Sequence, residues 1–137
     1  MVDKLTDELF TFFNGFASWE NSVIKASDVT VAEAHAIEIL GQLGPMNMKT
    51  LAQNLGVTTG TTTVTVDKLE KKGYAKRESV KEDRRVNLIT LTDKGRNIFD
   101  EHHKYHHSLT QQILAVLTEE EGQQLLHILQ KVNSEAF

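Results

Sequence analysis

The middle third of this 137-residue sequence constrains the fold most, because helical patterning gives way to β-prone patterning without a linker. Two short helices are expected over 48–55 and 59–72, each followed by a glycine. Two β-prone segments follow, over 74–80 and 86–91, joined by the charged residues 81–85. Two helices separated by a tight turn and followed at once by a hairpin form a winged helix-turn-helix.

Residues that begin helices stand at regular places along the chain. Thr30, Asn47, Thr92 and Thr118 can each accept a hydrogen bond from the first turn of a helix. Glutamate follows Thr30 and Thr118 by three residues, which is the pattern of a capping box. With a helix before Pro45 and two long ones after the hairpin, the chain is expected to be mainly α with a small β-hairpin wing.

The N-terminal helix has a pattern typical of contact with another chain. Leu5, Leu9, Phe12 and Phe16 recur every three or four residues, which places them along one side of a helix. Phe13 lies outside that stripe, and a small domain cannot bury aromatic rings on several sides of one helix. We therefore expect another chain to cover part of this surface. The alternative is a helix buried wholly in the core of its own chain.

Composition limits the remaining choices. A length of 137 residues, with 39% hydrophobic and 25% charged residues, fits one globular domain. The absence of cysteine excludes disulfides, thiolate zinc sites and cysteine nucleophiles. The first residues lack the order of a signal peptide, and no apolar run approaches about 18 residues, so we expect a cytoplasmic protein without membrane contact.

Charge is segregated along the chain. The formal net charge is −4, yet residues 46–96 hold eleven of the fifteen Lys and Arg and only six of the nineteen Asp and Glu. Binding to a polyanion depends on the local potential and on the number of phosphates neutralised. Double-stranded DNA is therefore a candidate partner despite the negative total; the alternative is a chance bias of the surface.

The second short helix is expected to present a reading face. At 100° per residue, Thr62, Thr65, Val66 and Leu69 fall on one side and should pack inward. Threonine costs helix propensity relative to alanine, so five threonines between residues 59 and 65 suggest a use at the surface. Hydroxyls can bond phosphates or base edges, and Val64 can contact a thymine methyl. The alternative is that some threonines bond the carbonyls of the preceding turn.

The charged hairpin tip is expected to enter the minor groove. An arginine there meets the deepest negative potential of the duplex, and a nearby carboxylate can fix its guanidinium. Residues two apart share a face of a strand, so Asp83 can support Arg85 while Arg84 points elsewhere, towards a phosphate. The alternative is an ordinary solvated turn.

Five motifs together resemble the multiple-antibiotic-resistance regulator (MarR) family. They are Leu51-Ala52, Gly60-Thr61, the run from Val66 to Tyr74, Asp83-Arg84-Arg85, and the run from Leu91 to Gly95. The resemblance implies one domain, 1–137, that forms a winged helix-turn-helix homodimer. Residues 1–29 and 93–137 would supply the dimerisation helices, and residues 30–92 would form the DNA-binding lobe.

The predicted DNA-contacting residues combine this resemblance with the chemistry above. They are Thr59, Gly60, Thr61, Thr63, Val64, Lys68, Lys71, Lys72, Lys76, Arg77, Asp83, Arg84 and Arg85. The predicted dimer interface contains Leu5, Leu9, Phe12, Phe13, Phe16, Leu125 and Leu129. Val64 stands where many members of the family carry arginine or another polar residue, which argues against a guanine contact at that position.

Histidines suggest two kinds of effector. His102 and His106 are four residues apart on one helix and can present two imidazoles to zinc, with His35 and Glu101 as further ligands. This resembles the zinc-uptake repressors of the family. The same histidine spacing also resembles its regulators of fatty-acid synthesis, which respond to acyl chains on acyl carrier protein. An acyl or other apolar molecule is therefore the alternative to zinc.

The favoured function is a sequence-specific regulator that binds double-stranded DNA, a ligand-responsive repressor acting as a homodimer on a pseudo-palindromic operator. Two other classes stay open. One is a metal-dependent enzyme that uses the His and Glu cluster, but the chain has no HExxH, no phosphate-binding glycine loop and no nucleophile elbow, so no enzymatic activity is expected. The other is a helical interaction module without DNA binding.

Overall fold

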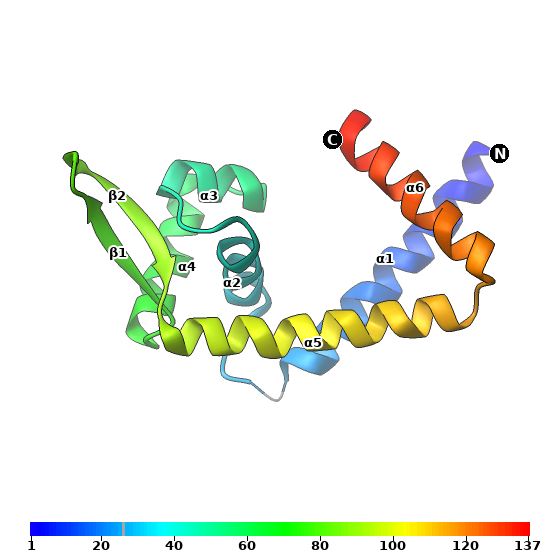
Figure 1. The fold of residues 1–137 in the computed structure, drawn as a ribbon, viewed down its shortest axis with the longest axis horizontal. Coiled ribbons are helices and arrows are strands. Elements are labelled where there is room, and N and C mark those ends of the chain that lie inside the picture. Colours follow the sequence, from blue (N-terminus) through cyan, green and yellow to red (C-terminus); the bar gives the residue numbers. More distant parts are fainter. Residues whose placement is uncertain (26) are drawn as a thin grey trace. The chain divides into compact units, whose positions relative to one another are not determined.

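The computed structural model describes residues 1–25 and 27–137. Its elements, in chain order, are α1 (Val2–Ile24), α2 (Val31–Leu43), α3 (Met48–Leu55), α4 (Thr59–Lys71), β1 (Ala75–Val80), β2 (Asp83–Leu91), α5 (Asp93–Ala115) and α6 (Glu119–Glu135) (Figure 1). The predicted fold class, mainly helical with one hairpin, is confirmed. The chain divides into two compact units, Met1–Glu101 and His102–Phe137.

Helix caps form where the sequence predicts them. Thr30 Oγ1 accepts the N–H of Glu33 at 3.2 Å, and Asn47 Oδ1 accepts the N–H of Thr50 at 2.8 Å. Thr118 and its glutamate complete a capping box before α6. Before α2, the Glu33 carboxylate does not complete the expected capping box with Thr30. It pairs instead with a lysine that is distant in sequence.

The helix-turn-helix is built by α3 and α4. Gly56 ends α3 with a φ of 68°, a left-handed conformation that glycine adopts without steric cost, and the chain turns at once towards α4. Gly73, between α4 and β1, also has a positive φ, of 80°. In Figure 1 the hairpin follows α4 directly, as a wing.

The wing is longer and its turn tighter than expected. The strands join through Lys81 and Glu82 alone, so the predicted five-residue connection is wrong. The register passes from Ser79 opposite Asn87 to Val80 opposite Asp83. Residues 84–86 consequently have no partner on β1, a bulge that lets the tip extend and twist while the strand continues.

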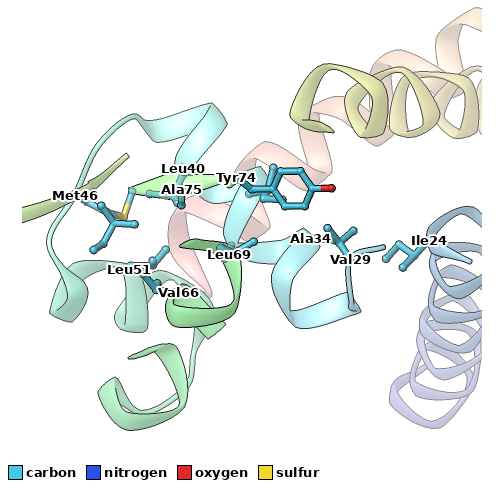
Figure 2. Packing of buried hydrophobic residues seen from close by; sticks show 13 residues of the cluster. Ile24, Val29, Ala34, Leu40, Met46, Leu51, Val66, Leu69, Tyr74 and Ala75 are labelled. Atoms are coloured by element: carbon cyan, nitrogen blue, oxygen red, sulfur yellow. The ribbon is translucent and has the colours of Figure 1, made fainter. Parts of the chain in front are cut away.

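The core of the first unit fixes the wing and α4 on the same support. Leu51, Val66 and Leu69 are fully buried where α3 meets α4, and Figure 2 shows them close together. Met46 exchanges backbone hydrogen bonds with Ile89 at 3.2 and 2.7 Å, which ties the segment before α3 to β2. The two reading elements are therefore held by one hydrophobic cluster.

The start of α5 packs closely on the same cluster. A Cβ at Gly95 would lie 1.9 Å from the backbone oxygen of Tyr74, so only glycine fits this contact. Thr92 also donates its N–H to the Tyr74 carbonyl at 3.1 Å. The helix that follows ends at Ala115, two residues before the predicted end near Leu117.

The second unit contains the rest of α5 and α6. An apolar groove of about 570 Å³ runs between them, lined chiefly by Leu114, Leu117, Leu125, Leu126 and Leu129. Many apolar side chains of α6 remain exposed. Over the described ranges, none of the helices combines the length and apolar character that crossing a bilayer requires.

Candidate nucleic-acid interface

The outer face of α4 carries residues predicted to read DNA. Thr62, Val66 and Leu69 have no exposed surface and Thr65 retains 8%, so the predicted inward face is confirmed. The exposed residues of the helix are Thr59, Gly60, Thr61, Val64, Asp67, Lys68 and Lys71. The helix thus presents threonine, glycine and valine in its first two turns, and one aspartate and two lysines beyond them.

Most of the threonine hydroxyls serve the helix itself. Those of Thr62, Thr63 and Thr65 donate to the carbonyl oxygens four residues earlier, at 2.9, 2.9 and 3.2 Å. Thr58 caps the helix by accepting the N–H of Thr61 at 3.1 Å. The alternative explanation of the threonine run is therefore confirmed for three residues: local back-bonding satisfies hydroxyls in a segment that helices otherwise disfavour.

Gly60 leaves the first turn of α4 open. A Cβ at this position would meet only Thr58 Oγ1, at 3.9 Å, so the chain's own packing does not require glycine here. Glycine inside a helix costs about 1 kcal/mol relative to alanine. Close approach of another molecule to the backbone is a use that accounts for this cost.

The wing carries a fixed arginine. The Arg85 guanidinium donates to both carboxylate oxygens of Asp83, at 3.1 and 3.3 Å, and the Arg85 backbone N–H donates to the same carboxylate at 3.0 Å. The hydrogen bond from the Arg85 side chain is the main reason why the pKa of Asp83 lies below its usual value. The predicted pairing is confirmed, and the Arg85 side chain stays 91% exposed.

Both predicted phosphate contacts on β1 are engaged in ion pairs. Arg77, on β1, pairs with Glu70 and lies 2.9 Å from Asp67, both on α4. Lys76 lies 2.7 Å from Glu78, and this hydrogen bond raises the pKa of Lys76. Arg77 therefore links the wing to α4, and neighbouring carboxylates offset both positive charges.

Lys72 has the most buried partner of the predicted contacts. Its Nζ lies 2.7 Å from a carboxylate oxygen of Glu33, whose side chain is only 2% exposed, and it also donates to the backbone carbonyl of Asp28. Tyr74 donates its hydroxyl to the Asp28 carboxylate at 2.5 Å, and Lys94 lies 4.9 Å from the centre of the Tyr74 ring. These residues connect the end of α4 to the start of α2.

Sequence patterns gave no signal for this network, because Lys72 and Glu33 are 39 residues apart and Tyr74 and Asp28 are 46 apart. The remaining predicted phosphate contacts are Lys68, Lys71 and Arg84. All three are exposed, and none makes an ion pair within 4 Å in the described part of the chain. Arg85 is also highly exposed, but it is paired with Asp83.

The predicted dimer residues of α1 and α6 lie on apolar surfaces. Leu5, Leu9, Phe12 and Phe13 are between 45% and 61% exposed, and Phe16 is half-buried. The rings of Phe12 and Phe16 stack at 6.4 Å. In α6, Leu129 is 49% exposed and Leu125 half-buried. Their contact with a second chain stays a prediction.

The predicted zinc ligands are placed as follows. His35 Nε2 lies 2.9 Å from Glu20 Oε1. On α5, His102 is buried, His106 is half-buried and Glu101 is exposed. Over residues 1–25 and 27–137, no group of three or more His, Asp and Glu side chains is gathered as a metal ion requires. The single chain thus offers no support for zinc, which stays a prediction for a binding measurement.

Known proteins resemble this chain in sequence and in fold. A sequence model of the MarR family matches residues 29–86. The HTH-type transcriptional regulator BilQ of Clostridium symbiosum is 26% identical over 121 residues, 88% of this chain and 84% of BilQ. The HTH-type transcriptional repressor MdtR of Bacillus subtilis is 32% identical over 104 residues, 76% of this chain and 67% of MdtR.

The fold comparison extends to a complex with DNA. FabT of Streptococcus pneumoniae, crystallised with DNA, superposes with a TM-score of 0.84 at 29% identity, covering 98% of this chain and 99% of FabT. The sequence motifs, the helix-turn-helix with its wing and these relatives agree: the chain belongs to the MarR family of winged-helix transcriptional regulators.

Proposed function

We propose that two copies of this chain form a homodimer that represses transcription by occupying a pseudo-palindromic operator. The α4 helices would enter successive major grooves about one helical turn apart, and the wings would enter the flanking minor grooves. The protein would act on DNA in the cytoplasm.

The observation that carries this proposal is the guanidinium of Arg85. It is almost fully exposed at the wing, yet two side-chain hydrogen bonds to Asp83 fix its direction. An exposed arginine held in one pose loses less side-chain entropy when it binds, and the narrow minor groove attracts it. The outer face of α4 lies on the same rigid cluster and supplies the major-groove surface.

The test compares Arg85→Ala with Lys131→Ala on duplexes from promoter regions of the host genome. Arg85→Ala should raise Kd at least about tenfold, because each dimer loses two minor-groove contacts. Lys131→Ala removes one exposed charge on α6, outside the basic segment, and should leave Kd unchanged. Unchanged affinity for the Arg85 variant would contradict the role of the wing, and a wild-type protein that binds none of these duplexes would favour the interaction module.

The dimer is supported by the apolar surfaces of α1 and α6. Phe10, Phe12 and Phe13 are 52% to 66% exposed on one helix, an arrangement that an isolated chain in water does not favour. Light scattering coupled to gel filtration should therefore give twice the chain mass. Phe13→Glu should shift the protein to the monomer and weaken operator binding with it. A wild-type monomer at micromolar concentration contradicts the dimer.

Zinc, an acyl chain on acyl carrier protein and other apolar molecules are the candidate effectors. Counting metal in protein incubated with zinc and then dialysed tests the first. Zinc retained by the wild-type protein and lost by His102→Ala with His106→Ala would establish a histidine site. Zinc content that is the same in both proteins would exclude a site at these two histidines, and the apolar molecules would then be the candidate effectors.

A further inference from the structure

The first two turns of α4 contain no side chain that reads guanine or adenine through paired hydrogen bonds. From Thr59 to Val66 the residues are threonine, glycine and valine only. Bidentate reading of these bases uses arginine, lysine, asparagine or glutamine, and residues near the start of a recognition helix contact the base edges. A direct hydrogen-bond code is therefore largely missing at the position where such a helix normally carries one.

The hydroxyls available on this face are partly used up. Thr63, half-exposed, donates its hydroxyl to the Thr59 carbonyl at 2.9 Å, which leaves an acceptor oxygen and a methyl group for a partner. The Thr61 hydroxyl accepts from Thr58 at 3.0 Å and so keeps its own proton as a single donor. Guanine offers two acceptors, N7 and O6, in the major groove, and single hydroxyl donors cannot pair with both as arginine or lysine does.

Cytosine is also badly matched. Its major-groove edge is a donor, which aspartate or glutamate recognises. Asp67 is the first carboxylate of α4, and its Oδ1 already accepts from the Arg77 guanidinium at 2.9 Å. Thymine differs from the other bases in presenting a C5 methyl group, which apolar side chains contact. Val64 is 53% exposed on the outer face. It lies one helical turn after Gly60, and because Gly60 has no Cβ, a partner can approach the backbone there.

We propose that the major-groove bases facing the first two turns of α4 are A·T pairs, and that Val64 reads them by packing against a thymine methyl. This inference rests on the proposed function, because it specifies the operator that the same interface accepts. Gly60 permits the approach, Val64 supplies the contact, and the threonine methyls extend the apolar surface around it.

The test first selects duplexes from a random library with the wild-type protein. In the selected operator each thymine is then replaced singly, in both half-sites, by deoxyuridine, which lacks only the methyl. At one symmetry-related pair of positions, replacing the thymine of one half-site should raise Kd about fourfold, which is the effect of losing one buried methyl group. Replacing the thymines of both half-sites should raise Kd about fifteenfold. Deoxyuridine elsewhere in the operator should leave Kd nearly unchanged.

A double-mutant cycle assigns the contact to one residue. Val64→Ala should weaken binding to the thymine duplex and lose most of the discrimination against deoxyuridine at that position. Val57→Ala is the matched control: it removes the same atoms from an exposed valine in the turn before α4, and it should keep the full discrimination.

Failure of this inference is distinguishable from failure of the proposed function. A protein that enriches no duplex has no operator, which removes both. A protein that enriches an operator, yet shows no methyl effect that depends on Val64, overturns the inference alone. An enriched operator with G·C pairs opposite Val64, whose recognition changes in Val64→Ala, overturns it as well.

Discussion

Lys72→Met distinguishes a structural lysine from one that holds a phosphate. The lysine Nζ lies 2.7 Å from a Glu33 oxygen, and Glu33 is 1% exposed, so methionine keeps the length of the side chain but leaves a buried carboxylate without its cation. Breaking a buried pair in this way costs about 3–5 kcal/mol. The Lys72 side chain is 30% exposed, so water can replace part of the lost interaction, and we expect about 2–3 kcal/mol.

Urea unfolding followed by circular dichroism, at one fixed protein concentration, measures this loss. Lys71→Met is the matched control: its lysine is exposed and unpaired in the described chain, so stability should change by less than about 0.5 kcal/mol. Adding Glu33→Gln to Lys72→Met should recover part of the stability, because the buried group is then neutral. Wild-type stability in Lys72→Met, together with a smaller salt dependence of DNA binding, would refute the structural role and restore the phosphate contact.

Three further predictions follow from single contacts. Gly60→Ala should raise the free energy of unfolding by about 0.5–1 kcal/mol, since alanine favours helix and its Cβ meets no close neighbour, while operator affinity measured by anisotropy falls. A variant that gains both stability and operator affinity would contradict a close approach of DNA to the backbone at Gly60. Arg77→Met should cost up to about 1 kcal/mol of stability and leave the slope of log Kd against log salt unchanged, because its charge is already paired; a shallower slope would identify a phosphate contact. The hydrogen bond from Tyr74 is the main reason why the pKa of Asp28 is lowered, so the ionised Asp28 stabilises the fold above its ordinary pKa of 3.8, and this stabilisation is lost as the pH falls through the lower folded value. Tyr74→Phe should therefore make the free energy of unfolding depend less on pH in acid. A pH profile identical to that of the wild type would contradict this.

Features encoded within one helical turn were predictable from the sequence. The inward face of α4 followed from its periodicity, and the end of α3 followed from Gly56, because both depend on residues adjacent in the chain. The support of Arg85 by Asp83 was predictable for the same reason, since the two residues are two apart. Local geometry leaves few alternatives at this range.

Features that depend on how separate helices or strands pair were not predictable. The glutamate after Thr30 fits a capping box locally, but its carboxylate pairs with Lys72, which only the packing of α4 against α2 brings near. The hairpin turn was misplaced because a charged five-residue run resembles a loop, whereas the bulge extends residues 84–86 as a strand without partners. Neither the Lys72–Glu33 ion pair nor the bulge corresponds to a pattern that can be recognised in a single sequence.

The same distinction changes how the basic segment should be interpreted. A surplus of cations between residues 46 and 96 predicts attraction to DNA, but it does not say which cations face the duplex. Lys72, Lys76 and Arg77 are paired with carboxylates of their own chain, so bringing them to phosphates would first break those pairs. The attraction must then come chiefly from Lys68 and Lys71 on the outer face of α4, from Arg84, and from Arg85, whose guanidinium stays 91% exposed although it is paired with Asp83. Because few unpaired charges lie beside the valine and threonine face, shape and methyl contacts have to supply much of the discrimination between sequences.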